Sequence, residues 1–109
     1  MVIKASSSSE IRRLVDALSS ADDVQRETAI ARLSIIGPRA VDRLIAAYNS
    51  ASERDTRIAV MRTLESIGDR RMIVVARKAI AEGSDEAIAA AAALRGLLNS
   101  THEIGRAHV

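Results

Sequence analysis

The side chains best suited to binding a metal lie near the end of the chain. His102 and Glu103 form a dipeptide, and His108 stands six positions after His102. Two imidazoles with a carboxylate can hold iron or zinc. These residues lie in a terminal stretch without a helical pattern that would fix their geometry. We therefore predict no metal site and no cofactor.

Other catalytic chemistry has little support among the residue types. The chain has no cysteine, and its five glycines are scattered, so it has no glycine-rich phosphate loop. The carboxylate pairs Asp22-Asp23 and Asp85-Glu86 fall at expected helix starts, where negative charge interacts favourably with the helix dipole. We expect a protein that is not an enzyme.

Composition excludes further classes of protein. The 109 residues suit one domain, and no apolar run reaches the roughly 18 residues of a membrane span. The single aromatic residue, Tyr48, offers no platform for stacking bases, and a net charge of +2 is a weak field. We expect neither a nucleic-acid partner nor a membrane. Residues 1–4 are too short for a signal peptide, so we expect a cytoplasmic protein.

The helical elements of the chain recur with a period near 31 residues. Any site would have to be positioned by these elements. Apolar residues recur three and four positions apart within each copy, which is helical spacing. A third, weaker copy spans Ala87 to Leu98. The matched positions of the first two copies are Arg26 and Arg57, Leu33 and Leu64, and Gly37 and Gly68.

This pattern predicts a stack of antiparallel helical hairpins. Gly37-Pro38 and Gly68-Asp69 mark helix junctions, with Asp69 as a cap. We expect a leader at 1–8, a repeat domain at 9–98 and a tail or partial helix at 99–109. The expected helices are 8–19, 22–36, 38–50, 53–67, 70–82 and 85–98. The expected core includes Leu33, Leu44, Leu64, Val75 and Leu94, with Tyr48 in the seam.

These residues resemble a known repeat. The series Arg57, Val60, Met61, Leu64, Ile67, Gly68 and Asp69 is similar to the HEAT-like repeat of the phycobilisome-lyase type. The resemblance covers about residues 9–98. It implies an all-α fold, a right-handed α-solenoid of about three hairpins with the last one incomplete. Most such proteins are protein-binding scaffolds. The resemblance also implies a structural role for Arg26, Arg57, Gly37, Gly68 and Asp69, in which the arginines bond a neighbouring repeat. The alternative is that both arginines bind an acidic partner.

Binding by such a scaffold would use the second helices of the repeats, which line the concave face in this family. Their basic residues form either a groove for an acidic peptide or phosphate backbone, or a solvated face of mixed charge. We predict a protein partner on this face. The candidate residues are Arg13, Arg39, Arg43, Arg70, Arg71, Arg77 and Lys78.

The last repeat offers a second candidate surface. Leu94, Leu97 and Leu98 give it an apolar end, and an exposed solenoid end needs a cap or a partner. The chain is then a fragment of a longer repeat protein, or this end is an interface for a homodimer or another protein. A different class of function is a fragment or accessory subunit of an enzyme. It would be similar to a bilin lyase or, through His102-Glu103, to the deoxyhypusine hydroxylases.

Overall fold

The computed structural model describes residues 8–83, 90–91 and 94–97, and these form helices and turns without any strand. The last six of these residues, 90–91 and 94–97, are helical. The remaining part of the expected helix 85–98 lies outside the described residues. The elements are α1 (Ser8–Ala17), α2 (Asp23–Ile36), the 3₁₀ helix η1 (Gly37–Ala40), α3 (Val41–Ser50), α4 (Arg54–Ile67) and α5 (Met72–Glu82).

Local chemistry explains where the helices begin and end. The Asp22 carboxylate caps α2 by accepting a hydrogen bond from the Val24 amide at 2.9 Å. Gly68 ends α4 in the left-handed conformation with φ of 72°, and its amide donates to the Leu64 carbonyl at 2.9 Å. A glycine adopts this backbone at little steric cost. The two expected helix junctions at Gly37 and Gly68 are confirmed.

Two expected helix starts were placed too early. Pro38 lies in the first turn of the 3₁₀ helix η1, and the α-helix starts at Val41 rather than at residue 38. After Gly68, the Asp69 carboxylate accepts a hydrogen bond from the Arg71 amide at 2.8 Å. This bond forms a turn first, so α5 starts at Met72 instead of residue 70, and Asp69 does not cap it directly.

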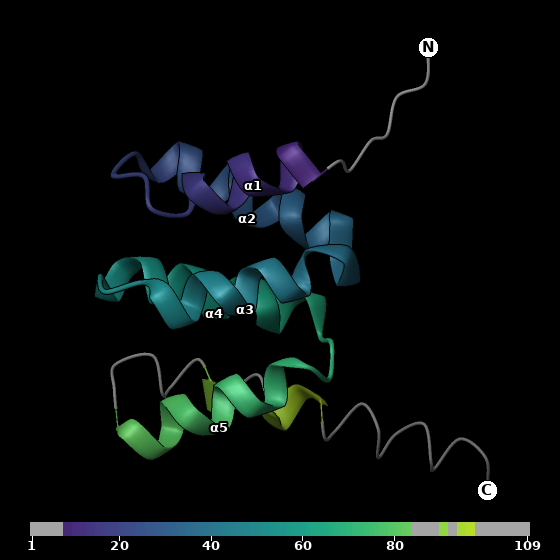
Figure 1. Cartoon of the computed structure of the whole chain (residues 1–109), viewed down its shortest axis with the longest axis vertical. Coiled ribbons are helices and arrows are strands. Elements are labelled where there is room, and N and C mark those ends of the chain that lie inside the picture. The colour runs from purple at the N-terminus through teal and green to yellow at the C-terminus, as the bar shows by residue number, and fades with distance from the viewer. Residues whose placement is uncertain (1–7, 84–89, 92–93, 98–109) are drawn as a thin grey trace, which may run out of the picture.

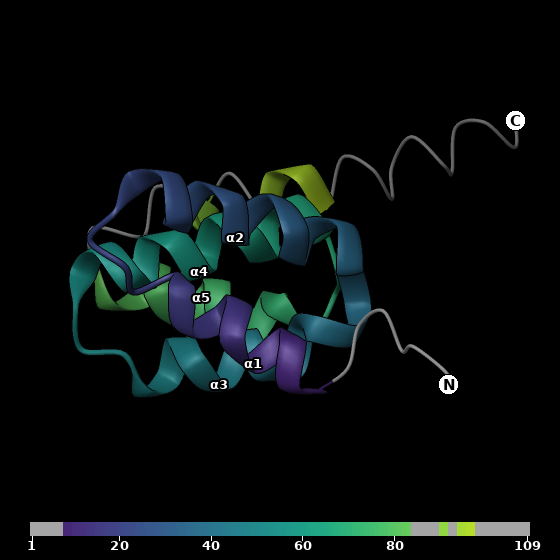
Figure 2. The ribbon, with the colours of Figure 1, turned by 90° about the horizontal axis from the view of Figure 1, so that it is seen from above.

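The helices lie in two layers. Figure 1 shows α1 above α3 and α3 above α5, with α2 and α4 behind them. The view from above in Figure 2 agrees, with α2 lying over α4 on the side away from α1 and α3. Contacts join α1 to α2, α3 to α4, α2 to α4, α1 to α3 and α3 to α5. The helices α1 to α4 therefore pack both on a hairpin partner and on the equivalent helix of the neighbouring pair, and α5 packs on α3 and α4.

The core lies between these layers. Leu33, Leu44 and Leu64 are fully buried and Val75 is nearly so, which confirms four of the five expected core positions. Leu94 is half-buried and packs against the edge of the core, so its expected burial was wrong in degree. Within the described residues, no helix is long and apolar enough to cross a membrane.

Candidate functional site

The two repeated arginines make different contacts. Arg26 donates from Nη1 to the Ser20 carbonyl at 2.9 Å and forms an ion pair with Asp23, so these bonds lie within its own hairpin. Arg57 donates from Nη2 to the Tyr48 hydroxyl at 3.2 Å in the preceding helix and lies 3.5 Å from Glu82 of the following helix. Arg57 thus bridges α3, α4 and α5.

Tyr48 is the buried partner of this bridge. It is 2% exposed, and its ring lies under the Arg57 guanidinium, 4.9 Å from the central carbon to the ring centroid. A cation over an aromatic face is attracted by the ring quadrupole. The seam position expected for Tyr48 is confirmed. Its hydroxyl and ring face are used in contacts that join successive helices.

Acidic residues of the α1, α3 and α5 layer pair with arginines. Glu10 of α1 bonds Arg32 of α2 at 2.8 Å, and Glu82 of α5 pairs with Arg57 of α4. Both arginines come from the other layer. The pairs therefore neutralise carboxylates of the α1, α3 and α5 layer and use no cation of that layer.

Arg71 is tied into the same layer by several bonds. Its guanidinium contacts Asp69 at 3.0 Å, Asp42 at 3.2 Å and the Pro38 carbonyl at 3.0 Å. The side-chain bond from Arg71, followed by its amide, holds the pKa of the Asp69 carboxyl below its ordinary value. Of the seven expected binding cations, Arg71 is thus engaged in joining the α5 turn to η1 and α3.

The layer of α1, α3 and α5 carries an excess of basic residues. The segments α1, η1, α3, α5 and the turn before α5 carry eight basic and five acidic residues, whereas α2, α4 and their caps carry five basic and six acidic. The charge is therefore biased toward the layer where the sequence placed the binding face. The exposed basic residues besides Arg71 are Arg12, Arg13, Arg39, Arg43, Arg70, Arg77 and Lys78.

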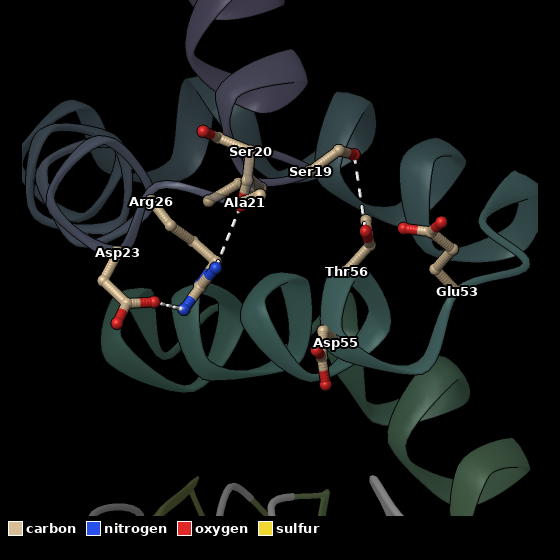
Figure 3. Close-up of a pocket in the computed structure, with 9 residues that line it drawn as sticks. Ser19, Ser20, Ala21, Asp23, Arg26, Glu53, Asp55 and Thr56 are labelled. Carbon is tan, nitrogen blue, oxygen red and sulfur yellow. Dashed lines mark hydrogen bonds and ion pairs between the residues drawn. The ribbon is translucent and has the colours of Figure 1, made fainter.

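A pocket that no sequence motif indicates lies at the turn between α1 and α2. It has a volume of about 300 Å³ and opens between this turn and the start of α4 (Figure 3). Its walls carry hydroxyls, carboxylates and one guanidinium. Figure 3 shows Arg26 directed to Asp23 and to the turn, while the Thr56 hydroxyl lies 3.4 Å from that of Ser19. The lining residues are Leu18, Ser19, Ser20, Ala21, Asp23, Arg26, Glu53, Asp55 and Thr56.

A second, smaller pocket of about 190 Å³ lies along α4 and shares two lining residues with the first. Its lining is Arg26, Asp55, Ile58, Ala59 and Arg62. Arg62 pairs there with Glu27 at 2.9 Å, and this bond lowers the pKa of the Glu27 carboxyl. No group of three or more metal-ligating side chains occurs in the described part of the chain. The residues that line the two pockets come from separate segments of the chain, so no local sequence motif indicates these pockets.

The other expected sites lie only partly within the described residues. Leu94 and Leu97 are half-buried and pack against the core, and Leu98 lies outside the described residues, as do His102, Glu103 and His108. Large apolar side chains are exposed elsewhere. Val24 and Ile35 on α2 are 73% and 82% exposed, and Val74 on α5 is 75% exposed.

Comparisons with known proteins do not assign this chain to a family. No family model matches the chain, and a search of curated proteins finds no significant match.

Proposed function

We propose that this protein is a non-enzymatic interaction module, a HEAT-like α-solenoid that binds an acidic segment of another protein across α1, α3 and α5. The way in which successive helix pairs pack supports the solenoid. The first helix pair contacts the second through both layers, and α5 contacts both α3 and α4. Such a stack gives a rigid surface on which side chains of successive repeats stand in register.

The observation that carries the proposed binding is the distribution of ion pairs. Arginines of α2 and α4 pair with Glu10 and Glu82, and Arg71 pairs with Asp42 and Asp69. The same face also carries the exposed cations Arg13, Arg43, Arg70, Arg77 and Lys78, beside the exposed acidic residue Asp16. A surface with a net positive charge attracts an acidic ligand and guides its approach.

Direct binding of a defined probe tests this function. A fluorescently labelled peptide of alternating glutamate and serine is titrated with the full chain at low and at high salt. We expect binding that weakens as salt rises, because exposed charges are screened. The variant Arg13→Gln/Arg43→Gln should weaken binding by about three- to tenfold, as expected when two exposed ion pairs are lost.

A matched variant separates this face from overall charge. Arg54→Gln/Arg62→Gln changes the net charge equally but on α4, where the Arg62–Glu27 pair is exposed and weakly stabilising. This variant should bind the peptide nearly as well as the unaltered chain. Equal loss in both variants, or no binding by the unaltered chain, would overturn the proposed function.

A further inference from the structure

Three equivalent positions of the repeat lie in a row across the proposed binding face. Arg13 of α1 corresponds to Arg43 of α3, and Arg43 corresponds to Val74 of α5, 31 residues later. All three residues are exposed, and α1 packs on α3 as α3 packs on α5. The row therefore presents two cations followed by one apolar side chain, each on a neighbouring helix.

We infer that this row binds an extended segment of polyproline II type with two carboxylates three residues apart and an apolar side chain three residues further on. The inference rests on the proposed function and specifies its ligand. Packed helices have axes about 8–10 Å apart. A polyproline II chain rises about 3.1 Å per residue with three residues per turn. Every third side chain therefore points the same way at a spacing of about 9 Å, which matches the helix spacing.

Other peptide conformations fit this row less well. In a β-strand, side chains three residues apart point to opposite faces, so two such carboxylates cannot both reach Arg13 and Arg43. In an α-helix, a spacing near 10 Å corresponds to seven residues rather than three. The spacing of acidic residues in the ligand therefore reports on its bound conformation.

Val74 makes the third position of the row distinct. It is 75% exposed, Arg77 and Lys78 stand three and four positions after it in α5, and Arg70 lies in the turn before α5. Residues at these spacings share one side of a helix. An apolar side chain is thus surrounded by cations, which favours a ligand whose apolar residue is accompanied by negative charge.

The neighbouring charged groups also change along the row. One turn after Arg13 stands Asp16, one turn after Arg43 stands Ala46, and one turn after Val74 stands Arg77. Asp42 beside Arg43 pairs with Arg71. The surroundings thus become more positive from α1 toward α5, so a free carboxyl terminus of the ligand is best placed beside α5.

Three labelled peptides test the spacing, each measured by fluorescence anisotropy at low salt against the full chain. The first is Glu-Pro-Ser-Glu-Pro-Ser-Leu, in which proline favours the polyproline II conformation. The second, Glu-Pro-Glu-Ser-Pro-Ser-Leu, has the same composition with carboxylates two residues apart. The third replaces the leucine of the first by serine. We expect the first to bind about two- to fivefold more tightly than the second, because one exposed ion pair is lost when the spacing is wrong.

A double-mutant cycle tests the apolar position by combining Val74→Ser in the protein with the replacement of leucine by serine in the peptide. Replacing leucine by serine in the peptide should weaken binding to the unaltered chain but not to Val74→Ser. The matched variant Ile35→Ser removes an equally exposed apolar side chain from α2 and should behave as the unaltered chain. This control separates the position on α5 from general surface hydrophobicity.

The outcomes distinguish this inference from the proposed function. One outcome is that the peptides with both spacings bind equally well and that Arg13→Gln/Arg43→Gln weakens the binding of both. The row then does not discriminate between carboxylate spacings, so the inference is wrong while the proposed function stands. If the leucine effect persists in Val74→Ser, the assigned apolar position is wrong. If no acidic peptide binds, the proposed function is wrong as well.

Discussion

The Arg57 guanidinium lies over the Tyr48 ring and also donates to the hydroxyl of that ring at 3.2 Å. We expect Tyr48→Phe, which keeps the ring but removes the acceptor, to lower the free energy of unfolding by about 1 kcal/mol. Arg57→Ala also removes the cation and the pairing with Glu82, and should lower it by about 2 kcal/mol. Urea unfolding followed by circular dichroism measures both. The exposed Arg12→Ala is the control, and an Arg57→Ala variant as stable as that control would contradict the bridging role.

Leu64 tests the buried seam between the layers. It is fully buried, so Leu64→Ala should lower the free energy of unfolding by about 2–5 kcal/mol through lost burial and the resulting cavity. Ile35→Ala on α2 removes the same number of carbon atoms from a side chain that is 82% exposed and should change stability little. Denaturant midpoints of the two variants give the comparison. An unchanged midpoint for Leu64→Ala would show that the core is assigned incorrectly.

Gly68 tests the backbone at the end of α4. A Cβ atom at this position would meet no neighbouring atom within 4 Å, so Gly68→Ala has room, and its effect comes from the positive φ of 72°. The left-handed conformation costs an alanine about 1–2 kcal/mol. Asparagine tolerates this conformation better, so Gly68→Asn should recover part of the loss in a thermal melt. Equal stability of all three proteins would mean that the turn relaxes to a different backbone.

Asp69 gives stability a defined pH dependence. Its folded-state pKa lies below its unfolded value, chiefly because the Arg71 side chain bonds the carboxylate. The stabilisation is therefore present above the unfolded pKa of about 4 and is lost as the pH falls through the lowered pKa. Asp69→Asn should make the melting temperature fall less steeply between about pH 5 and pH 2.

Glu27 contributes acid sensitivity of the same sign through Arg62, so some slope should remain in Asp69→Asn. The double variant Asp69→Asn/Glu27→Gln should be flatter still. An unchanged pH profile in the single variant would show that Asp69 is not held by Arg71 in solution.

Sequence periodicity predicted the helices and most of the core because burial in a stack follows apolar spacing. Leu33 and Leu64 occupy equivalent places in successive copies, and both are fully buried. Leu94 occupies a further apolar position but is only half-buried, since periodicity does not reveal how much chain covers the edge of the core. The start of α5 lies later than predicted because the Asp69 carboxylate accepts a hydrogen bond from the Arg71 amide, which forms a turn before the helix.

The candidate surfaces were predictable to different degrees. The basic residues of the proposed face could be found in the sequence because repeats place equivalent positions on one side. The ion pairs that the neighbouring acidic residues form could not be predicted. Glu10 pairs with Arg32 across 22 positions of sequence, and Glu82 pairs with Arg57 across 25. The pocket near Thr56 combines the α1–α2 turn with the start of α4, and neither segment carries a motif.

The bonds of Arg71 bear on how the protein unfolds. This residue stands just before α5, and it holds the Pro38 carbonyl and the Asp42 carboxylate of the preceding helix pair. In repeat proteins, contacts between neighbours determine whether units open singly or together. Partial unfolding of α5 that carries Arg71 away must break these bonds, so the opening of α5 is coupled to η1 and α3. Amide hydrogen exchange in α5 and in η1 should therefore follow a shared opening event.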